Sequence, residues 1–220
     1  MKNLITINKN IRTACPDLQL GLLSCKVNVE PTSGGLAERI ANSLEELQSR
    51  LEVPQISQLP IAQETRRGYK ATGKDPARYR PSAEALLRRV IKGKGLYKIN
   101  NVVDALNLIS VETAYSIGGY DMDNIQGNIK LGIGEANEPY EGIGRGELNI
   151  KGLATLRDDL GAFGTPTSDS ARTSVSENTK RFLMVFYNFE GSNLLEGALD
   201  KTATLYREHL RAEDVQMAIV

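Results

Sequence analysis

The sequence has one histidine and two cysteines among 220 residues. The histidine, His209, falls in a helical pattern near the C-terminus, where a surface position is expected and a Ser-His-Asp or Cys-His arrangement would have to reach across the fold. The usual ligand sets of a zinc ion cannot be assembled from so few residues. We therefore expect no metal and no other cofactor. Cys15 and Cys25 lack a CxxC spacing and are expected as reduced core residues.

Long hydrophobic runs are also missing. A membrane-spanning helix needs about 20 apolar residues, and the first eight residues, MKNLITIN, lack the apolar stretch of a signal peptide. A cytoplasmic protein without a membrane partner is expected. With 40% hydrophobic and 25% charged residues, the chain can bury one large core or two small ones. We expect a single domain over residues 1–220.

The charges balance overall, with 27 residues of each sign, but they are distributed unevenly. The segment Arg66–Lys98 contains eleven basic residues and only two acidic ones, Asp75 and Glu84. Such asymmetry is typical of a surface that meets phosphate, and an ordinary solvated helix face is the alternative. The residues expected to contact RNA are Lys74, Arg78, Arg80, Arg88 and Arg89.

Hydrophobic spacing predicts an α+β fold in which mixed sheets pack with helices. A strand is expected over about 18–29, followed by a helix over about 36–51. A basic loop over 72–80 leads into a helix that begins at Pro81 and ends at Gly93 and Gly95, with Ala85, Leu86 and Val90 inward. A third helix over about 102–110 is expected to end before a turn at Gly118-Gly119.

The second half of the chain has the pattern of a sheet. Eight glycines between Gly132 and Gly164, with short β-like runs such as residues 147–150, predict strands joined by tight turns. Residues 181–189 are apolar on both parities, as in a central strand buried on both faces. An amphipathic helix over about 194–210 follows.

The best candidate for chemistry is the run Gly161–Ser170, which combines a glycine turn, hydroxyls and one carboxylate. Backbone N–H groups in such turns can stabilise developing negative charge, and Ser168 or Asp169 could position a water as the catalytic residue. An ordinary loop with turn-capping hydroxyls is the alternative. The run Gly142–Gly146 lacks the GK[ST] of a phosphate loop and is interpreted as strand and turn that could line a pocket.

Two further polar residues are candidates for ligand binding. Arg145 lies among turn glycines and either faces solvent or points at a ligand. Asn107 interrupts an apolar helix pattern and is either a satisfied core amide or a pocket donor.

Several motifs together resemble a known family. They are residues 99–107 (INNVVDALN), Glu112, residues 117–121 (IGGYD), residues 161–164 (GAFG) and residues 177–179 (ENT). Over about residues 66–189 they resemble the central tRNA-editing module, the third and fourth domains, of the bacterial phenylalanyl-tRNA synthetase β chain. The resemblance implies an α+β module, which in that family hydrolyses tyrosine wrongly attached to the phenylalanine tRNA.

The resemblance also assigns site residues. Asn107 falls on an asparagine of the family's editing pocket and Gly164 on a pocket glycine, whereas Gly118 and Val185 replace the family's pocket histidine and glutamate. The residues expected to bind substrate are Asn107, Tyr120, Arg145, Gly164 and Thr165.

These observations lead to a functional prediction. We expect a free-standing domain that hydrolyses a mischarged aminoacyl-tRNA in trans, with Arg145 or Arg80 on the terminal phosphates, and without ligase activity because no motif for adenylate formation is present. The expected partner is tRNA or aminoacyl-tRNA and not DNA. The alternatives are a non-catalytic tRNA or amino-acid binding module and a small-metabolite protein that keeps the fold. The amino acid, the tRNA and the oligomeric state stay open.

Overall fold

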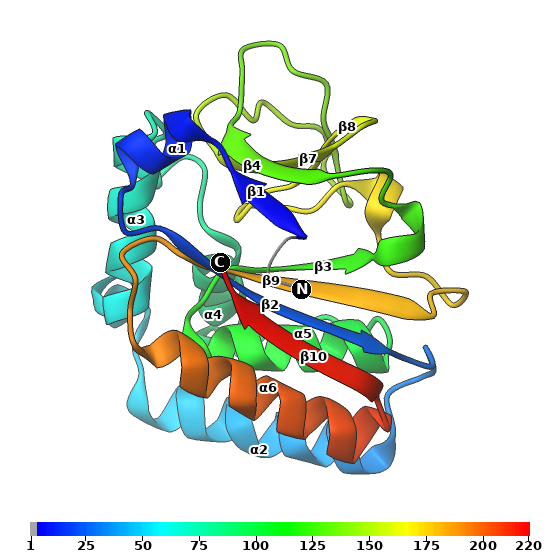
Figure 1. The fold of residues 1–220 in the computed structure, drawn as a ribbon. Helices are drawn as coiled ribbons and strands as arrows, with labels where there is room; N and C mark the ends of the chain where they lie inside the picture. The colour runs from blue at the N-terminus through cyan, green and yellow to red at the C-terminus, as the bar shows by residue number, and fades with distance from the viewer. Residues whose placement is uncertain (1–3) are drawn as a thin grey trace.

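The computed structural model of the chain describes residues 4–220 and has the α+β architecture that the sequence predicts. A four-stranded central sheet of order β10-β2-β9-β3 is covered on one face by helices and on the other by a four-stranded outer sheet of order β1-β4-β7-β8 (Figure 1). The central strands are β2 (Gln19–Lys26), β3 (Ile117–Asp121), β9 (Arg181–Asn188) and β10 (Glu213–Ile219). The outer strands are β1 (Ile5–Ile7), β4 (Ile129–Ile133), β7 (Ala154–Asp158) and β8 (Gly161–Gly164).

Strand β9 is the centre of the molecule, as predicted. It pairs antiparallel with β2 over Gln19–Lys26 and with β3 over Ile117–Asp121. Phe182, Met184 and Phe186 belong to the apolar core on the helical side, whereas Leu183, Val185 and Tyr187 belong to the core between the two sheets. Every residue of the strand after Arg181 is buried, so both faces of the central sheet are dry.

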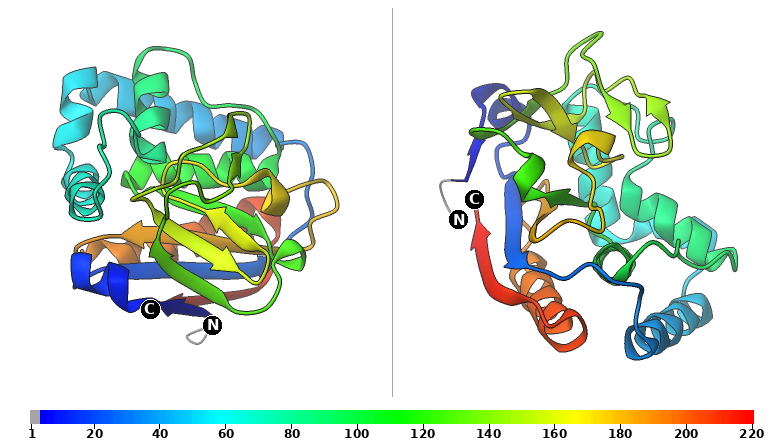
Figure 2. Two further views of the ribbon diagram at one scale, coloured as in Figure 1. Left: turned by 90° about the horizontal axis from the view of Figure 1, so that it is seen from above. Right: turned by 90° about the vertical axis from the view of Figure 1, so that its right-hand side faces the viewer.

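The helical layer consists mainly of three helices. Helix α5 (Asn101–Thr113) packs against α6 (Leu194–Leu210) and α2 (Gly34–Arg50), and α2 and α6 lie on the face opposite the outer sheet (Figure 2). Ser33 caps α2 by accepting a hydrogen bond from the backbone N–H of Leu36. The three helices predicted over about 36–51, 102–110 and 194–210 are confirmed.

Two shorter helices border the helical layer. They are α3 (Pro60–Ala71) and α4 (Ser82–Ile91), and α4 follows Pro81 as predicted. The inward face of α4 is Ala83, Leu87 and Val90, while Ala85 and Leu86 are only half-buried. The prediction that Ala85 and Leu86 face the core is therefore wrong, because both residues line a cavity that the sequence pattern does not reveal.

Other predictions need correction. Gly118 and Gly119 lie within β3 rather than in a turn, and the chain reverses earlier, at Ala114 (φ 60°). Of the expected β run over 147–150, only Glu147 lies in a strand, in the small hairpin of β5 (Glu141–Gly142) and β6 (Gly146–Glu147). Four further elements were not predicted from the sequence: β1, α1 (Lys9–Ala14), α3 and β10.

The cysteines and the histidine lie where expected. Cys15 and Cys25 are buried free thiols, and burial raises the pKa of Cys25 to about 12. His209 is half-buried in the last turn of α6. No helix within residues 4–220 combines the length and the apolar character needed to span a membrane.

Candidate functional site

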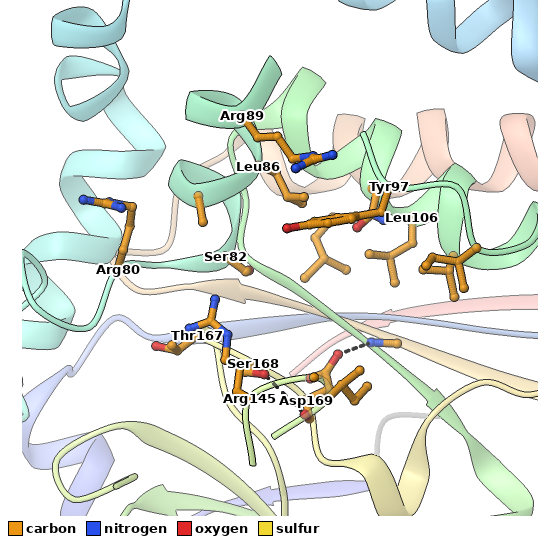
Figure 3. Close-up of a pocket in the computed structure, with 18 of the residues that line it drawn as sticks. Arg80, Ser82, Leu86, Arg89, Tyr97, Leu106, Arg145, Thr167, Ser168 and Asp169 are labelled. Atoms are coloured by element: carbon orange, nitrogen blue, oxygen red, sulfur yellow. Dashed lines mark hydrogen bonds between the residues drawn. The ribbon is translucent and has the colours of Figure 1, made fainter. Parts of the chain in front are cut away.

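A cavity of about 850 Å³ opens between α4 and α5 on one side and the loop after β8 on the other. Figure 3 shows the two walls: Leu86, Arg89 and Leu106 come from the helices, and Ser168 and Asp169 from the loop. The β5–β6 hairpin contributes Ile143, Gly144 and Arg145, and β3 contributes Ile117 and Gly119. Elements spread along the chain from Arg80 to Val175 therefore meet at one site.

Most of the residues predicted for the site line this cavity. Asn107 is half-buried on its helical wall, which fits the pocket interpretation rather than the core one. The predicted residues that the cavity brings together are Arg80, Arg88, Arg89, Asn107, Arg145, Ser168 and Asp169.

Asp169 is the one carboxylate among the lining residues. Its Oδ1 accepts a hydrogen bond from the Tyr120 hydroxyl at 2.7 Å, and its Oδ2 accepts one from the backbone N–H of Gly119 at 3.1 Å. Burial raises the pKa of Asp169 to about 7, against the opposing effect of these two donors. The carboxyl group therefore titrates close to neutral pH.

Two glycines make this arrangement possible. A Cβ at Gly118 would lie 1.9 Å from the Tyr120 hydroxyl, and a Cβ at Gly164 would lie 2.2 Å from it. The tyrosine ring stands edge-on to Phe163, with ring centroids 5.0 Å apart. The Tyr120 hydroxyl, bonded to Asp169, thus fills the space beside Gly118, the position that the resemblance aligns with a pocket histidine.

The resemblance aligns Val185 with a pocket glutamate, and in the structure Val185 belongs to the core between the two sheets. Val185 lies directly opposite Gly118 in the β3–β9 register and is fully buried. Tyr120 itself is buried behind Asp169, and Gly164 packs on Tyr120. The structure therefore assigns Tyr120 and Gly164 to the support of Asp169 and does not place them on the cavity wall.

Thr165 has a similar supporting position. Its hydroxyl oxygen accepts hydrogen bonds from the backbone N–H groups of Thr167 and Ser168, and the hydroxyl donates to the carbonyl of Ser168 at 2.9 Å. The Tyr140 hydroxyl donates to the same carbonyl at 2.6 Å. Thr165 is buried and shapes the loop that presents Ser168 and Asp169.

The mouth of the cavity is basic. The lining cations form none of the ion pairs found within residues 4–220, and they are Arg80, Arg88, Arg89, Lys92, Lys94 and Arg145. Unpaired cations around an apolar cavity favour an anionic ligand. No group of three or more His, Cys, Asp or Glu side chains in the described part of the chain could hold a metal ion.

Two of the predicted RNA contacts lie elsewhere. Arg78 is exposed but outside the cavity lining. Lys74 is buried, donates to the carbonyls of Asn149 and Lys151 at 2.7 Å each, and lies 3.6 Å from the centre of the Tyr79 ring. The position of Lys74 does not support a role in RNA binding, because its ammonium group is used to hold a loop.

Two cavity residues were not predicted from the sequence. The Ser82 hydroxyl oxygen is buried without a hydrogen-bond partner among the described residues, and Tyr97 is 54% exposed at the edge of the cavity. Ser82 follows Pro81 in the first turn of α4, where a serine is unremarkable as a helix start. Tyr97 follows Gly93 and Gly95 in a stretch with three lysines, and its isolation in this basic stretch was the available signal.

The sequence matches the model of a known protein family. Residues 64–204, well over half of the chain, match the B3/4 domain. No protein with a curated function matches the sequence. Among solved structures, the chain is similar to the crystal structure of an N-terminal fragment of the phenylalanyl-tRNA synthetase beta-subunit from Pyrococcus horikoshii, with 12% identity and a TM-score of 0.49. The alignment covers 95% of this chain and 49% of that fragment, so this chain spans about half of its length. The chain belongs to the B3/4 domain family.

Proposed function

We propose that the cavity binds the aminoacylated 3′ end of a tRNA and hydrolyses a wrongly attached amino acid in trans, without ligase activity. One observation carries the proposal: a single site combines a cationic mouth, an apolar wall and one carboxylate on the loop opposite that wall. An aminoacyl-tRNA end offers matching chemistry, because it joins phosphates, a ribose ester and an amino-acid side chain.

Each part of the ligand has a counterpart in the cavity. Arg80 and Arg145 are exposed at its mouth and suit the terminal phosphates. Leu86, Leu106 and Ile117 form an apolar surface for the amino-acid side chain, and the Asn107 amide beside them suits its polar groups. This arrangement would leave the ester near Ser168 and Asp169.

Asp169 is proposed as the base for the hydrolytic water. A carboxylate that titrates near pH 7 is well matched to proton transfer at physiological pH. The water oxygen adds to the ester carbonyl carbon while its proton passes to Asp169. The bond between that carbon and the ribose oxygen then breaks, the ribose oxygen takes up the proton, and the free amino acid leaves.

A deacylation screen tests the proposal. Purified protein is incubated with tRNAs charged with different amino acids, alongside Asp169→Asn, Asn107→Ala and the control Asp200→Asn, which changes an exposed carboxylate on α6. We expect one class of ester to be cleaved, and Asp169→Asn to slow cleavage about 100-fold or more. If Asp169→Asn cleaves at the normal rate, Asp169 is not the base.

The pH dependence sharpens the role of Asp169. The enzymatic rate, after subtraction of the rate in buffer, should rise with pH and level off above about pH 7, because the ionised carboxylate is the active form. Tyr120→Phe removes a hydrogen bond to that ionised form, so the midpoint should move to higher pH. An unchanged midpoint in Tyr120→Phe would show that another group controls the rate.

One observation favours a second function, a binding module without catalysis. Gly118 and Val185 replace the histidine and glutamate of the editing module that the sequence resembles, and the structure fills both positions with Tyr120 and core packing. In that case every ester should decay at the buffer rate while tRNA still binds at low salt. The affinity should then fall steeply as salt rises.

A further inference from the structure

The connection between α4 and α5 carries an exposed aromatic residue. This connection, which we call the strap, comprises residues 92–100. Tyr97 and Ile99 are 54% and 61% exposed, although both are large and apolar. They line the site cavity and also a second cavity of about 550 Å³ between the strap and α2. The strap therefore separates two cavities, and the aromatic side chain of Tyr97 lines both.

The ring of Tyr97 has a defined orientation. The guanidinium carbon of Arg89 lies 4.1 Å from the ring centre, which is a cation–π contact. Figure 3 shows Arg89 on the side of the ring away from the loop that carries Ser168 and Asp169. The opposite face of the ring is directed toward the cavity.

Tyr97 differs in this respect from most tyrosines of the chain. Tyr69, Tyr115, Tyr120, Tyr187 and Tyr206 are almost completely buried. The ring of Tyr97, by contrast, is exposed and held by Arg89, so it contributes little to the apolar core.

Positive charge surrounds this ring. Lys92 and Lys94 line the site cavity with Tyr97, and Lys98 lines the second cavity. Asp104, the carboxylate that lines the second cavity, is buried and accepts hydrogen bonds from the Thr32 hydroxyl and the backbone N–H of Ile99. The lysines of the strap are therefore exposed to solvent, whereas the carboxylate of Asp104 is engaged in hydrogen bonds within the fold.

We propose that Tyr97 is a stacking platform for an unpaired base of a single-stranded RNA end, with Arg88, Lys92 and Lys94 binding the adjoining phosphates. Aromatic rings with a cationic groove are the usual means of holding single-stranded nucleic acid, because every base has a face that can stack. Single-stranded ends are also the parts of RNA whose bases are free to do so. This inference rests on the proposed function for its choice of ligand.

The test uses uncharged RNA, so it does not depend on hydrolysis. A short single-stranded RNA with 2-aminopurine as its 3′-terminal base is titrated with the full-length protein at low salt, and fluorescence quenching reports stacking. Four proteins are compared: wild type, Tyr97→Ala, Tyr97→Phe and Ile99→Ala. The last changes an equally exposed strap residue that has no ring.

We expect quenching in the wild type, a loss of affinity of about tenfold in Tyr97→Ala, and changes below about threefold in Tyr97→Phe and Ile99→Ala. A Tyr97→Ala protein that binds and quenches normally overturns the proposal. Equal losses in Tyr97→Phe and Tyr97→Ala also overturn it, since the phenyl ring retains the stacking surface. Circular dichroism of each variant separates a loss of binding from a loss of folding.

The two proposals can fail separately. If Tyr97-dependent binding is observed while no ester is cleaved, the hydrolase proposal alone is wrong. If esters are cleaved with the same KM by wild type and Tyr97→Ala, the stacking proposal alone is wrong.

Discussion

The first and second halves of the basic segment carry similar charge and use it differently. In residues 66–79, three of the five cations have partners: Arg66 pairs with Glu84, Arg67 pairs with Glu190, and Lys74 donates to two backbone carbonyls. In residues 80–98, the cations that line the site cavity form no ion pairs within residues 4–220. Local carboxylates and burial, rather than net charge, therefore decide which cations remain free to meet a ligand.

The largest effect is expected at the Arg66–Glu84 pair. Glu84 is 1% exposed, so Arg66→Met leaves a buried carboxylate without its cation and should lower the free energy of unfolding by about 3 kcal/mol. Urea denaturation measures this. The double variant Arg66→Met/Glu84→Gln should recover part of the loss, and a double variant no more stable than the single one would contradict the pairing.

Lys74→Met should come next. The variant keeps the aliphatic stem but removes two hydrogen bonds from a charged donor, and we expect a loss of about 2 kcal/mol in unfolding free energy. RNA affinity of the folded variant should stay within about twofold of wild type. The matched control is Lys70→Met on the exposed face of α3, which should change neither quantity. Weaker RNA binding by Lys74→Met, measured where the protein is folded, would break the comparison between the two halves.

Lys92→Gln should show the opposite behaviour. Its stability should stay within about 0.5 kcal/mol of wild type, while the slope of log affinity against log salt for single-stranded RNA should become shallower by about 0.7, the value for one lost phosphate contact. The control Lys130→Gln changes an exposed lysine of the outer sheet. Equal slopes in Lys92→Gln and wild type would mean that Lys92 meets no phosphate.

The smallest effect is expected at Arg67. The side chains of Arg67 and its partner Glu190 are 56% and 39% exposed. Because exposed ion pairs contribute little to stability, Arg67→Gln should lower the free energy of unfolding by less than about 0.5 kcal/mol. Its RNA binding should not change. A loss as large as that in Arg66→Met would show that exposure does not separate the two pairs.

The elements with strong periodicity could be predicted from the sequence. Strand β9 is apolar or aromatic from Phe182 to Tyr187, and α2 and α6 repeat leucine at helical spacing, so burial alone specifies them. Strand β10 was missed because it is an edge strand with mostly exposed residues, and such a strand has little apolar alternation to detect.

The site was predicted in part for a similar reason. Asp169, Arg145 and Asn107 are polar residues in apolar or glycine-rich contexts, which is a local signal. The partnership of Tyr120 with Gly118 and Gly164 depends on the β3–β9 pairing and on a contact across more than forty residues. The local sequence pattern does not indicate this contact, and Gly118-Gly119 was therefore predicted to be a turn.

The pairing of β2 with β9 has a consequence for how the chain folds. The register joins Gln19 to Asn188, residues 169 positions apart, and the other edge of β2 is occupied by β10, near the end of the described residues. During synthesis β2 is made early, and neither of its partner strands, β9 and β10, is available until most of the chain has been made. Closing so long a loop before any pairing is gained makes the topology a slow one. Formation of the central sheet, and not of any helix, should therefore limit the rate at which the cavity is assembled.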